Sequence, residues 1–77
     1  MPTVLRVGAY RFHFYEGQEP PHIHVRTPEG ECKFWLGTVL LAGSRGVRAS
    51  ELRRIERLVH EHRQFLIDKY HEFHSAH

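Results

Sequence analysis

The chain changes its pattern of apolar and polar positions once, near residue 43. Before that point apolar residues alternate with polar ones, which is typical of β-strands with one buried face; after it they recur at helical spacing. The alternation predicts four strands and a shorter fifth one, at residues 4–7, 10–15, 22–26, 31–36 and 38–41. Gly8-Ala9 fits a two-residue hairpin turn and Thr27-Pro28-Glu29-Gly30 a four-residue turn, so the strands are expected to form an antiparallel meander.

A single long helix is expected over residues 50–74, after a loop at residues 43–49. Ser50 is a suitable N-cap, because its hydroxyl can accept a hydrogen bond from the first turn. Apolar residues recur along the helix without an intervening Gly or Pro, so the pattern supports no bend near Arg63-Gln64.

The turn lengths fix which residues face each other across the strands. The first turn pairs Val7 with Tyr10, and the second pairs Val25 with Cys32. One face of the sheet then carries Leu5, Val7, Tyr10, Phe12, Phe14, Ile23, Val25, Cys32, Phe34 and Leu36. Covering this face with the helix gives one α+β domain over residues 1–77. It is a two-layer fold in which four or five antiparallel strands (residues 1–42) pack against one long C-terminal helix.

The predicted helix is longer than the sheet it covers. It would measure about 36 Å, whereas strands of this length span about 17 to 20 Å. The far end would overhang and leave Leu66, Tyr70 and Phe73 without a core beneath them. Because such a patch is usually covered by a partner or a second copy, these residues are predicted to form an interface, for example in a homodimer.

The chain has 77 residues, a formal net charge of +2, one cysteine and eight histidines. This length excludes a two-domain enzyme. Cys32 has no partner for an internal disulfide, and there is neither an apolar run long enough for a membrane span nor a secretory signal pattern. A cytoplasmic protein without membrane contact is therefore expected. The histidines would gain charge as the pH falls through about 6.5.

The opposite side of the sheet, called the polar face below, gathers ionisable and aromatic residues. It carries Arg6, Arg11, His13, Tyr15, His22, His24, Arg26, Lys33 and Trp35. Two rows of neighbours about 5 Å apart are expected, one of His13, His24 and Lys33 and one of Tyr15, His22 and Trp35. Glu31, at the edge, is the only acid expected there, so the face is predicted to be basic.

A basic face with imidazoles and aromatic rings favours an anionic partner, RNA above all. Basic side chains pair with phosphates, and aromatic rings stack on bases. A histidine beside a second histidine and a lysine is also a minimal acid-base set for cleaving an RNA backbone. A metal-independent ribonuclease-like activity is therefore an open hypothesis, in which His22, His24 and Lys33 are the catalytic candidates.

Other functions fit the same residues. His22-Ile23-His24 places two imidazoles on one side of a strand, a spacing that can chelate Zn²⁺ or another transition metal, and His13 could supply a third ligand. Lys33 and the lack of a carboxylate to orient the imidazoles count against this metal site. Trp35 and Tyr15 are also typical anchors of a surface that binds a partner protein. A structural dimer or adaptor, with only solvent on the polar face, is a further alternative.

Several segments carry a family resemblance. They are Met1-Pro2-Thr3-Val4-Leu5-Arg6, the aromatic strand from Tyr10 to Tyr15, Pro20-Pro21-His22-Ile23-His24-Val25, Lys33-Phe34-Trp35-Leu36 and Glu51-Leu52-Arg53-Arg54-Ile55. Together they resemble the small bacterial proteins of domain-of-unknown-function family 4160. The resemblance implies a cytoplasmic bacterial or phage-borne protein, often encoded beside a protein of domain-of-unknown-function family 2442. That two-gene arrangement is similar to a toxin-antitoxin module.

We therefore expect one component of such a module, whose polar face contacts RNA or a partner protein. His22 and His24 would transfer protons or contact phosphates, and Lys33 and Arg26 would clamp phosphates. Further contacts to the nucleic acid or partner are expected from Arg11, Tyr15, Arg26 and Trp35. No cofactor is expected unless the metal hypothesis holds.

Overall fold

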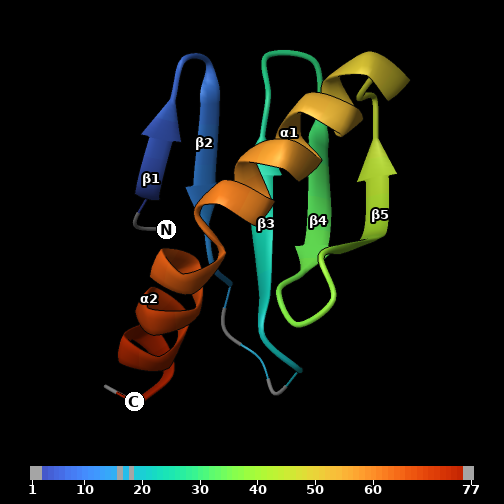
Figure 1. Cartoon of the computed structure of the whole chain (residues 1–77). Helices are drawn as coiled ribbons and strands as arrows, with labels where there is room; N and C mark the ends of the chain where they lie inside the picture. Colours follow the sequence, from blue (N-terminus) through green and yellow to red (C-terminus); the bar gives the residue numbers. More distant parts are fainter. Residues whose placement is uncertain (1–2, 16, 18, 76–77) are drawn as a thin grey trace.

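The computed structural model describes residues 3–15, 17 and 19–75 and shows a five-stranded sheet with two helices on one of its faces (Figure 1). The elements are β1 (Thr3–Val7), β2 (Tyr10–His13), β3 (His22–Arg26), β4 (Glu31–Trp35), β5 (Leu40–Arg45), α1 (Ala49–Glu61) and α2 (Arg63–Ser75). The strands lie in chain order and all neighbours are antiparallel. The predicted two-layer α+β meander is confirmed. Within the described residues, neither helix is long and apolar enough to cross a membrane.

The strand pairing agrees with the register expected from the turn lengths. Val7 faces Tyr10 across the first hairpin, and Val25 faces Cys32 across the second. In the second turn the Thr27 hydroxyl oxygen accepts hydrogen bonds from the backbone N–H groups of Glu29 and Gly30. This closed turn fixes the register of β3 and β4 and so decides which side chains share a face.

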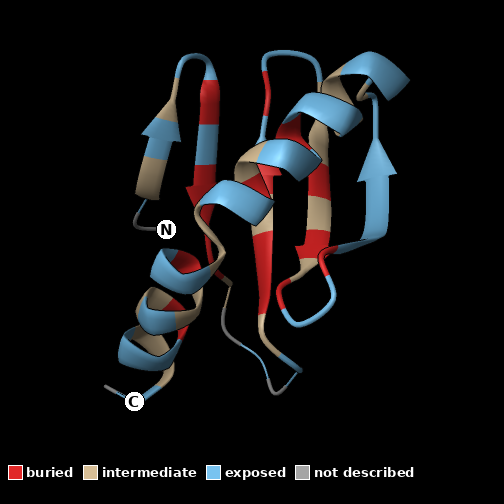
Figure 2. Cartoon of the chain, viewed as in Figure 1, coloured by how far each residue is buried: buried red, intermediate tan, exposed pale blue. Residues whose placement is uncertain are grey.

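The fifth strand starts later than expected and extends further. It includes part of the segment 43–49 that was predicted as a loop. Val39, just before the strand, has φ of 55°, a left-handed conformation that is rare for a β-branched residue, and its side chain is buried in the core. The chain therefore turns at Val39, and pairing with β4 begins at Leu40. All six residues of β5 are exposed (Figure 2).

The core lies between the apolar face of the sheet and α1. Phe12 and Ile23 from the sheet and Ile55 and Val59 from α1 are completely buried. The buried positions are concentrated on β2, β3 and β4 behind α1 (Figure 2). Cys32 belongs to this core, and burial raises the pKa of its thiol to about 12, so it is a packing residue and not a thiolate.

The helical region consists of two helices, so the prediction of one long helix is wrong. The break falls at His62, where the backbone leaves the helical range. The side chain of Arg63 donates hydrogen bonds to the backbone oxygens of Leu36 (2.8 Å) and Gly37 (3.2 Å), which follow β4. The helix therefore breaks without a Gly or Pro, at a point where Arg63 is anchored to the segment that follows β4. Ser50, the expected N-cap, lies inside α1.

The break allows α2 to pack on the rest of the chain. Leu66 is 0% exposed and Tyr70 7% exposed, and Phe73 is partly buried against the core. The ring of Phe14 lies 5.5 Å from that of Tyr70 and 5.7 Å from that of Phe73. The Tyr70 hydroxyl donates a hydrogen bond of 2.7 Å to the backbone oxygen of Glu19. The expectation of an overhanging, uncovered helix end at Leu66, Tyr70 and Phe73 is wrong, because the chain itself covers these residues.

Gly30 lies where the turn between β3 and β4 meets the end of β5. A Cβ atom on Gly30 would overlap the backbone oxygen of Arg45. Only a residue without a side chain permits such an approach. The contact holds the end of β5 against the turn, with Arg45 opposite Glu31.

We expect Gly30→Ala to lower the free energy of unfolding by about 1–3 kcal/mol, because its methyl group must displace the backbone of β5. Urea unfolding measures this change. Gly43→Ala is the matched control: nothing lies within 4 Å of its Cβ position. It should change the free energy by less than about 0.5 kcal/mol. A Gly30→Ala protein as stable as the wild type would contradict the close approach.

Candidate functional site

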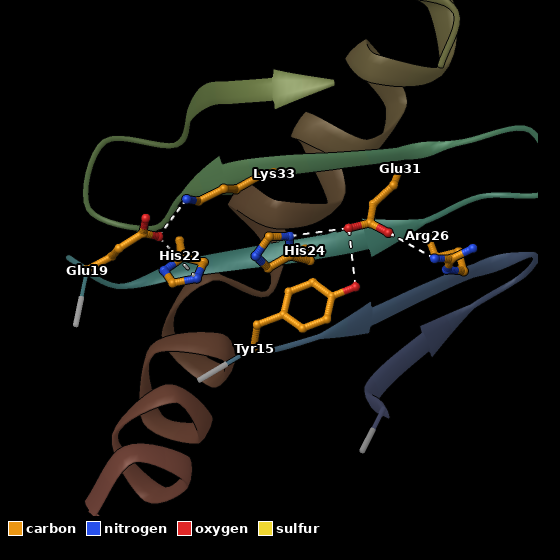
Figure 3. A network of polar contacts seen from close by, with 7 residues as sticks. All are labelled: Tyr15, Glu19, His22, His24, Arg26, Glu31 and Lys33. Carbon is orange, nitrogen blue, oxygen red and sulfur yellow. Dashed lines mark hydrogen bonds and ion pairs between the residues drawn. The ribbon is translucent and has the colours of Figure 1, made fainter. Parts of the chain in front are cut away.

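The polar face is the side of the sheet turned away from the helices (Figure 3). Its side chains form rows across the strands, since facing residues of antiparallel strands point to the same side. The arginine row crosses all five strands and consists of Arg6, Arg11, Arg26, Glu31 and Arg45. The histidine row consists of His13, His24 and Lys33, as predicted. Arg45 was missed because the sequence pattern placed it in a loop.

On the polar face the ring of His24 contacts the rings of both His13 and His22. The rings of His13 and His24 stack with centroids 5.7 Å apart and an angle of 19° between their planes. The ring of His22 meets that of His24 edge-on at 5.1 Å. His13 and His22 are buried, whereas the side chain of His24 is 16% exposed. His24 is therefore the imidazole of this group that is most accessible to a ligand.

Tyr15 packs against the histidine row and does not face His22. Because β2 ends at His13, Tyr15 lies beyond the ladder of paired residues. Its ring centroid is 4.9 Å from that of His13 and 4.4 Å from that of His24. Of the expected row of Tyr15, His22 and Trp35, only the pairing of His22 with Trp35 is confirmed.

Glu31 is the carboxylate that joins the two rows (Figure 3). One oxygen lies 3.2 Å from the Arg26 guanidinium. The other lies 3.5 Å from Nδ1 of His24 and accepts a hydrogen bond of 3.4 Å from the Tyr15 hydroxyl. The expectation that no carboxylate orients the imidazoles is therefore wrong. The signal was present in the sequence, since Glu31 is diagonal to His24 across β3 and β4, within reach of a long side chain.

A second carboxylate, Glu19, reaches the polar face from the connection between β2 and β3. It forms an ion pair with Lys33 and lies 3.7 Å from Nε2 of His22. The hydrogen bond from Lys33 lowers the pKa of Glu19. The ammonium of Lys33 also lies 4.6 Å from the centre of the Trp35 ring, and Nδ1 of His22 donates to the backbone oxygen of Pro20. The sequence did not predict Glu19, because its position depends on the path of a loop.

Two of the histidines are neutral near pH 7. Burial lowers the pKa of His24 to about 4, and the neighbouring His22 adds to this effect, while Glu31 opposes it. Burial also lowers the pKa of His13. The expected gain of charge near pH 6.5 is therefore wrong for His13 and His24. A neutral His24 can accept a proton at neutral pH.

The described part of the polar face does not assemble a metal site. Among the described residues, no group of three or more His, Cys, Asp or Glu side chains is placed to hold a metal ion. Imidazole lone pairs lie in the plane of the ring, and the nearly parallel rings of His13 and His24 do not direct them to one point. The His22 and His24 pair has no third ligand from His13, so no observation favours the metal hypothesis.

Two open hollows flank the contact between His24 and Glu31. One of about 210 Å³ is lined by His24, Glu31, Cys32, Lys33, Gly43, Ser44 and Arg45. The other, of about 190 Å³, is lined by Thr3, Arg11, His13, Tyr15 and Arg26. Each hollow places a guanidinium group beside an imidazole, which suits an anionic ligand better than a cation.

The fold and these contacts define a small two-layer α+β domain with a basic, histidine-rich sheet face. The family model described as Domain of unknown function (DUF4160) matches residues 9–71, and the chain belongs to this family. The matched span includes both rows of the polar face except Arg6. No curated protein and no solved structure matches the chain.

Replacing His24 with Gln should make the protein less sensitive to acid. Below pH 6.5 the unfolded chain protonates His24, whereas the folded chain does so only near pH 4. The contribution of a neutral His24 to stability is therefore complete above pH 6.5 and is lost as the pH falls toward 4. Urea unfolding between about pH 7.5 and pH 5 should show a smaller loss for His24→Gln than for the wild type.

The comparison stops at pH 5 so that protonation of Glu19 does not affect the result. The pKa of this carboxyl is lowered from 4.5, so its contribution to the stability of the folded protein is lost only at lower pH. His60→Gln is the matched control, because His60 is exposed on α1, and it should lose as much stability as the wild type. If His24→Gln also loses as much as the wild type, His24 is not held neutral by the folded protein.

Proposed function

We propose that this protein is one component of a small bacterial two-gene, toxin-antitoxin-like module, and that it contacts RNA through its polar face. Membership of the DUF4160 family supports the module, because the resemblance described above implies a neighbouring gene that encodes a protein of domain-of-unknown-function family 2442. That protein is the proposed partner, and the cytoplasm is the proposed location.

The observation that carries the RNA contact is a neutral imidazole set among cationic side chains. His24 faces Lys33 directly, and hollows lined by guanidinium groups lie on both sides of it. Phosphates would bind the cations, and the partly exposed Tyr15 and Trp35 would contact bases. This combination fits a phosphodiester chain better than it fits an uncharged protein surface.

The catalytic candidates differ in what they can contact. Nδ1 of His24 faces Glu31, which leaves Nε2 to accept a proton, for example from a ribose 2′-hydroxyl. His22 is 2% exposed, and its ring nitrogens lie near Pro20 and Glu19, so we assign it a positioning role. In this proposal His24 transfers the proton, and Lys33 stabilises the phosphate.

Lys33 and Glu19 should change RNA affinity in opposite directions. Lys33→Gln removes a cation from the polar face and should weaken binding by roughly 3- to 10-fold. Glu19→Gln releases Lys33 from its ion pair and should strengthen binding. Fluorescence anisotropy with a labelled single-stranded RNA measures both. The matched controls are Lys69→Gln and Glu72→Gln, an ion pair on α2, which should leave the affinity unchanged. Equal affinities for all four variants would contradict contact at Lys33.

The module is tested by growth of cells that express the two genes separately and together. We expect one of the two proteins alone to slow growth, co-expression to restore it, and this protein to capture the adjacent gene's product in a pull-down. His22→Ala combined with His24→Ala should reduce RNA affinity and alter the growth effect. Failure of both genes to affect growth, with no complex formed, would contradict the module. Normal toxicity and affinity in the double variant would contradict the role of the histidines.

A further inference from the structure

The arginine row places like charges directly opposite each other. Arg6 faces Arg11 across β1 and β2, and Arg11 faces Arg26 across β2 and β3. Glu31 and Arg45 continue the same row on β4 and β5. Like charges in this arrangement destabilise a sheet. The row therefore works against the stability of the folded chain unless an anion binds to it.

Little within the protein compensates this charge. Glu31 is the only carboxylate of the row, and it is already in contact with Arg26, His24 and Tyr15. The side chains of Arg6, Arg11 and Arg45 are exposed and form no ion pair or hydrogen bond with the residues that the structure describes. As far as the described residues go, these three guanidinium groups have no partner and can bind a ligand from solution.

The spacing of the row fits an extended polyanion. Neighbouring strands lie about 4.8 Å apart, so the row measures about 19 Å from β1 to β5. Guanidinium groups bind phosphate oxygens in pairs of parallel hydrogen bonds. A single phosphate would engage one end of the row, whereas a chain of phosphates can engage Arg6, Arg11 and Arg45 together.

We propose that the arginine row binds the backbone of single-stranded RNA, which crosses the sheet from β1 to β5, perpendicular to the strands. This inference rests on the RNA contact proposed above and adds the path that the RNA backbone takes across the sheet. The imidazoles of the neighbouring histidine row and the Tyr15 ring that packs against them lie beside this path, where they can contact riboses and bases. An acidic protein would use the cations but not these rings, so RNA is the favoured ligand.

Glu31 then acts as an internal competitor for the backbone. It holds Arg26 and is the acidic member of the row over the part of the chain that the structure describes. Removing that charge should strengthen RNA binding, whereas removing the free guanidinium groups should weaken it. These opposite changes in RNA affinity distinguish the proposal from a general loss of folding, because unfolding would weaken binding in both kinds of variant.

The test measures binding of a labelled single-stranded RNA of roughly 12 nucleotides to the full chain at several salt concentrations. The triple variant Arg6→Gln, Arg11→Gln and Arg45→Gln should bind on the order of 10- to 100-fold more weakly. Its slope of log affinity against log salt should be smaller by about 2, since each phosphate contact to a single strand contributes about 0.7. Glu31→Gln should bind more tightly than the wild type.

The matched control is the triple variant Arg53→Gln, Arg54→Gln and Arg57→Gln. These residues are exposed on α1, on the other side of the sheet, and their removal changes the net charge by the same amount. The control should bind RNA as the wild type does. Equal losses in both triple variants would show attraction by net charge alone and would overturn the arginine row as the binding site.

The remaining outcomes separate this inference from the proposed function. If the wild type binds RNA and the row variant binds equally well, the path across the row is wrong and the RNA contact stands. If the wild type binds no RNA, both proposals fail. If only the adjacent gene's product binds, and the row variant abolishes that binding, the row is a protein-binding surface and the RNA inference is overturned.

Discussion

The register of β3 and β4 is the constraint on which the rest of the structure depends. The turn closes with a hydrogen bond of 2.8 Å between the Thr27 N–H and the Gly30 backbone oxygen. A slip of one residue would send Ile23 to the solvent and turn the imidazoles of His22 and His24 toward α1. Burying those polar groups without partners would be costly. One short turn therefore decides both which face packs on the helices and which residues meet on the polar face.

The sequence predicted those features of the fold that depend on residues close together in the chain, and missed those that depend on residues far apart. The pairings of Val7 with Tyr10 and Val25 with Cys32 were predictable, because alternation and turn length are local properties. The helix break was not, since the Arg63 side chain contacts carbonyl groups 26 and 27 residues away in the chain. The same holds for Glu19, whose contact with Lys33 depends on a loop.

The distribution of charge on the polar face differs from that expected from composition. Eight histidines suggested a face whose charge depends on pH, yet burial keeps His24 neutral, with a pKa of about 4. Lys33 is paired with Glu19, and Arg26 with Glu31. Permanent positive charge without a partner among the described residues is left on the guanidinium groups at one end of the strands. The site is therefore two adjoining regions, a paired cluster around His24 and a cationic row beside it.

Glu31 couples these two regions. Burial is the main reason that the pKa of His13 is lowered, and the guanidinium groups of Arg26 and Arg11 add to it. A phosphate bound to those guanidinium groups would offset their positive potential and favour proton uptake by the imidazole of His13. Glu31 already supplies part of that negative charge, since one oxygen faces Arg26 and the other faces His24. The proposed binding of an RNA backbone along the row and the proposed proton transfer at the histidines would therefore act on the same electrostatic field.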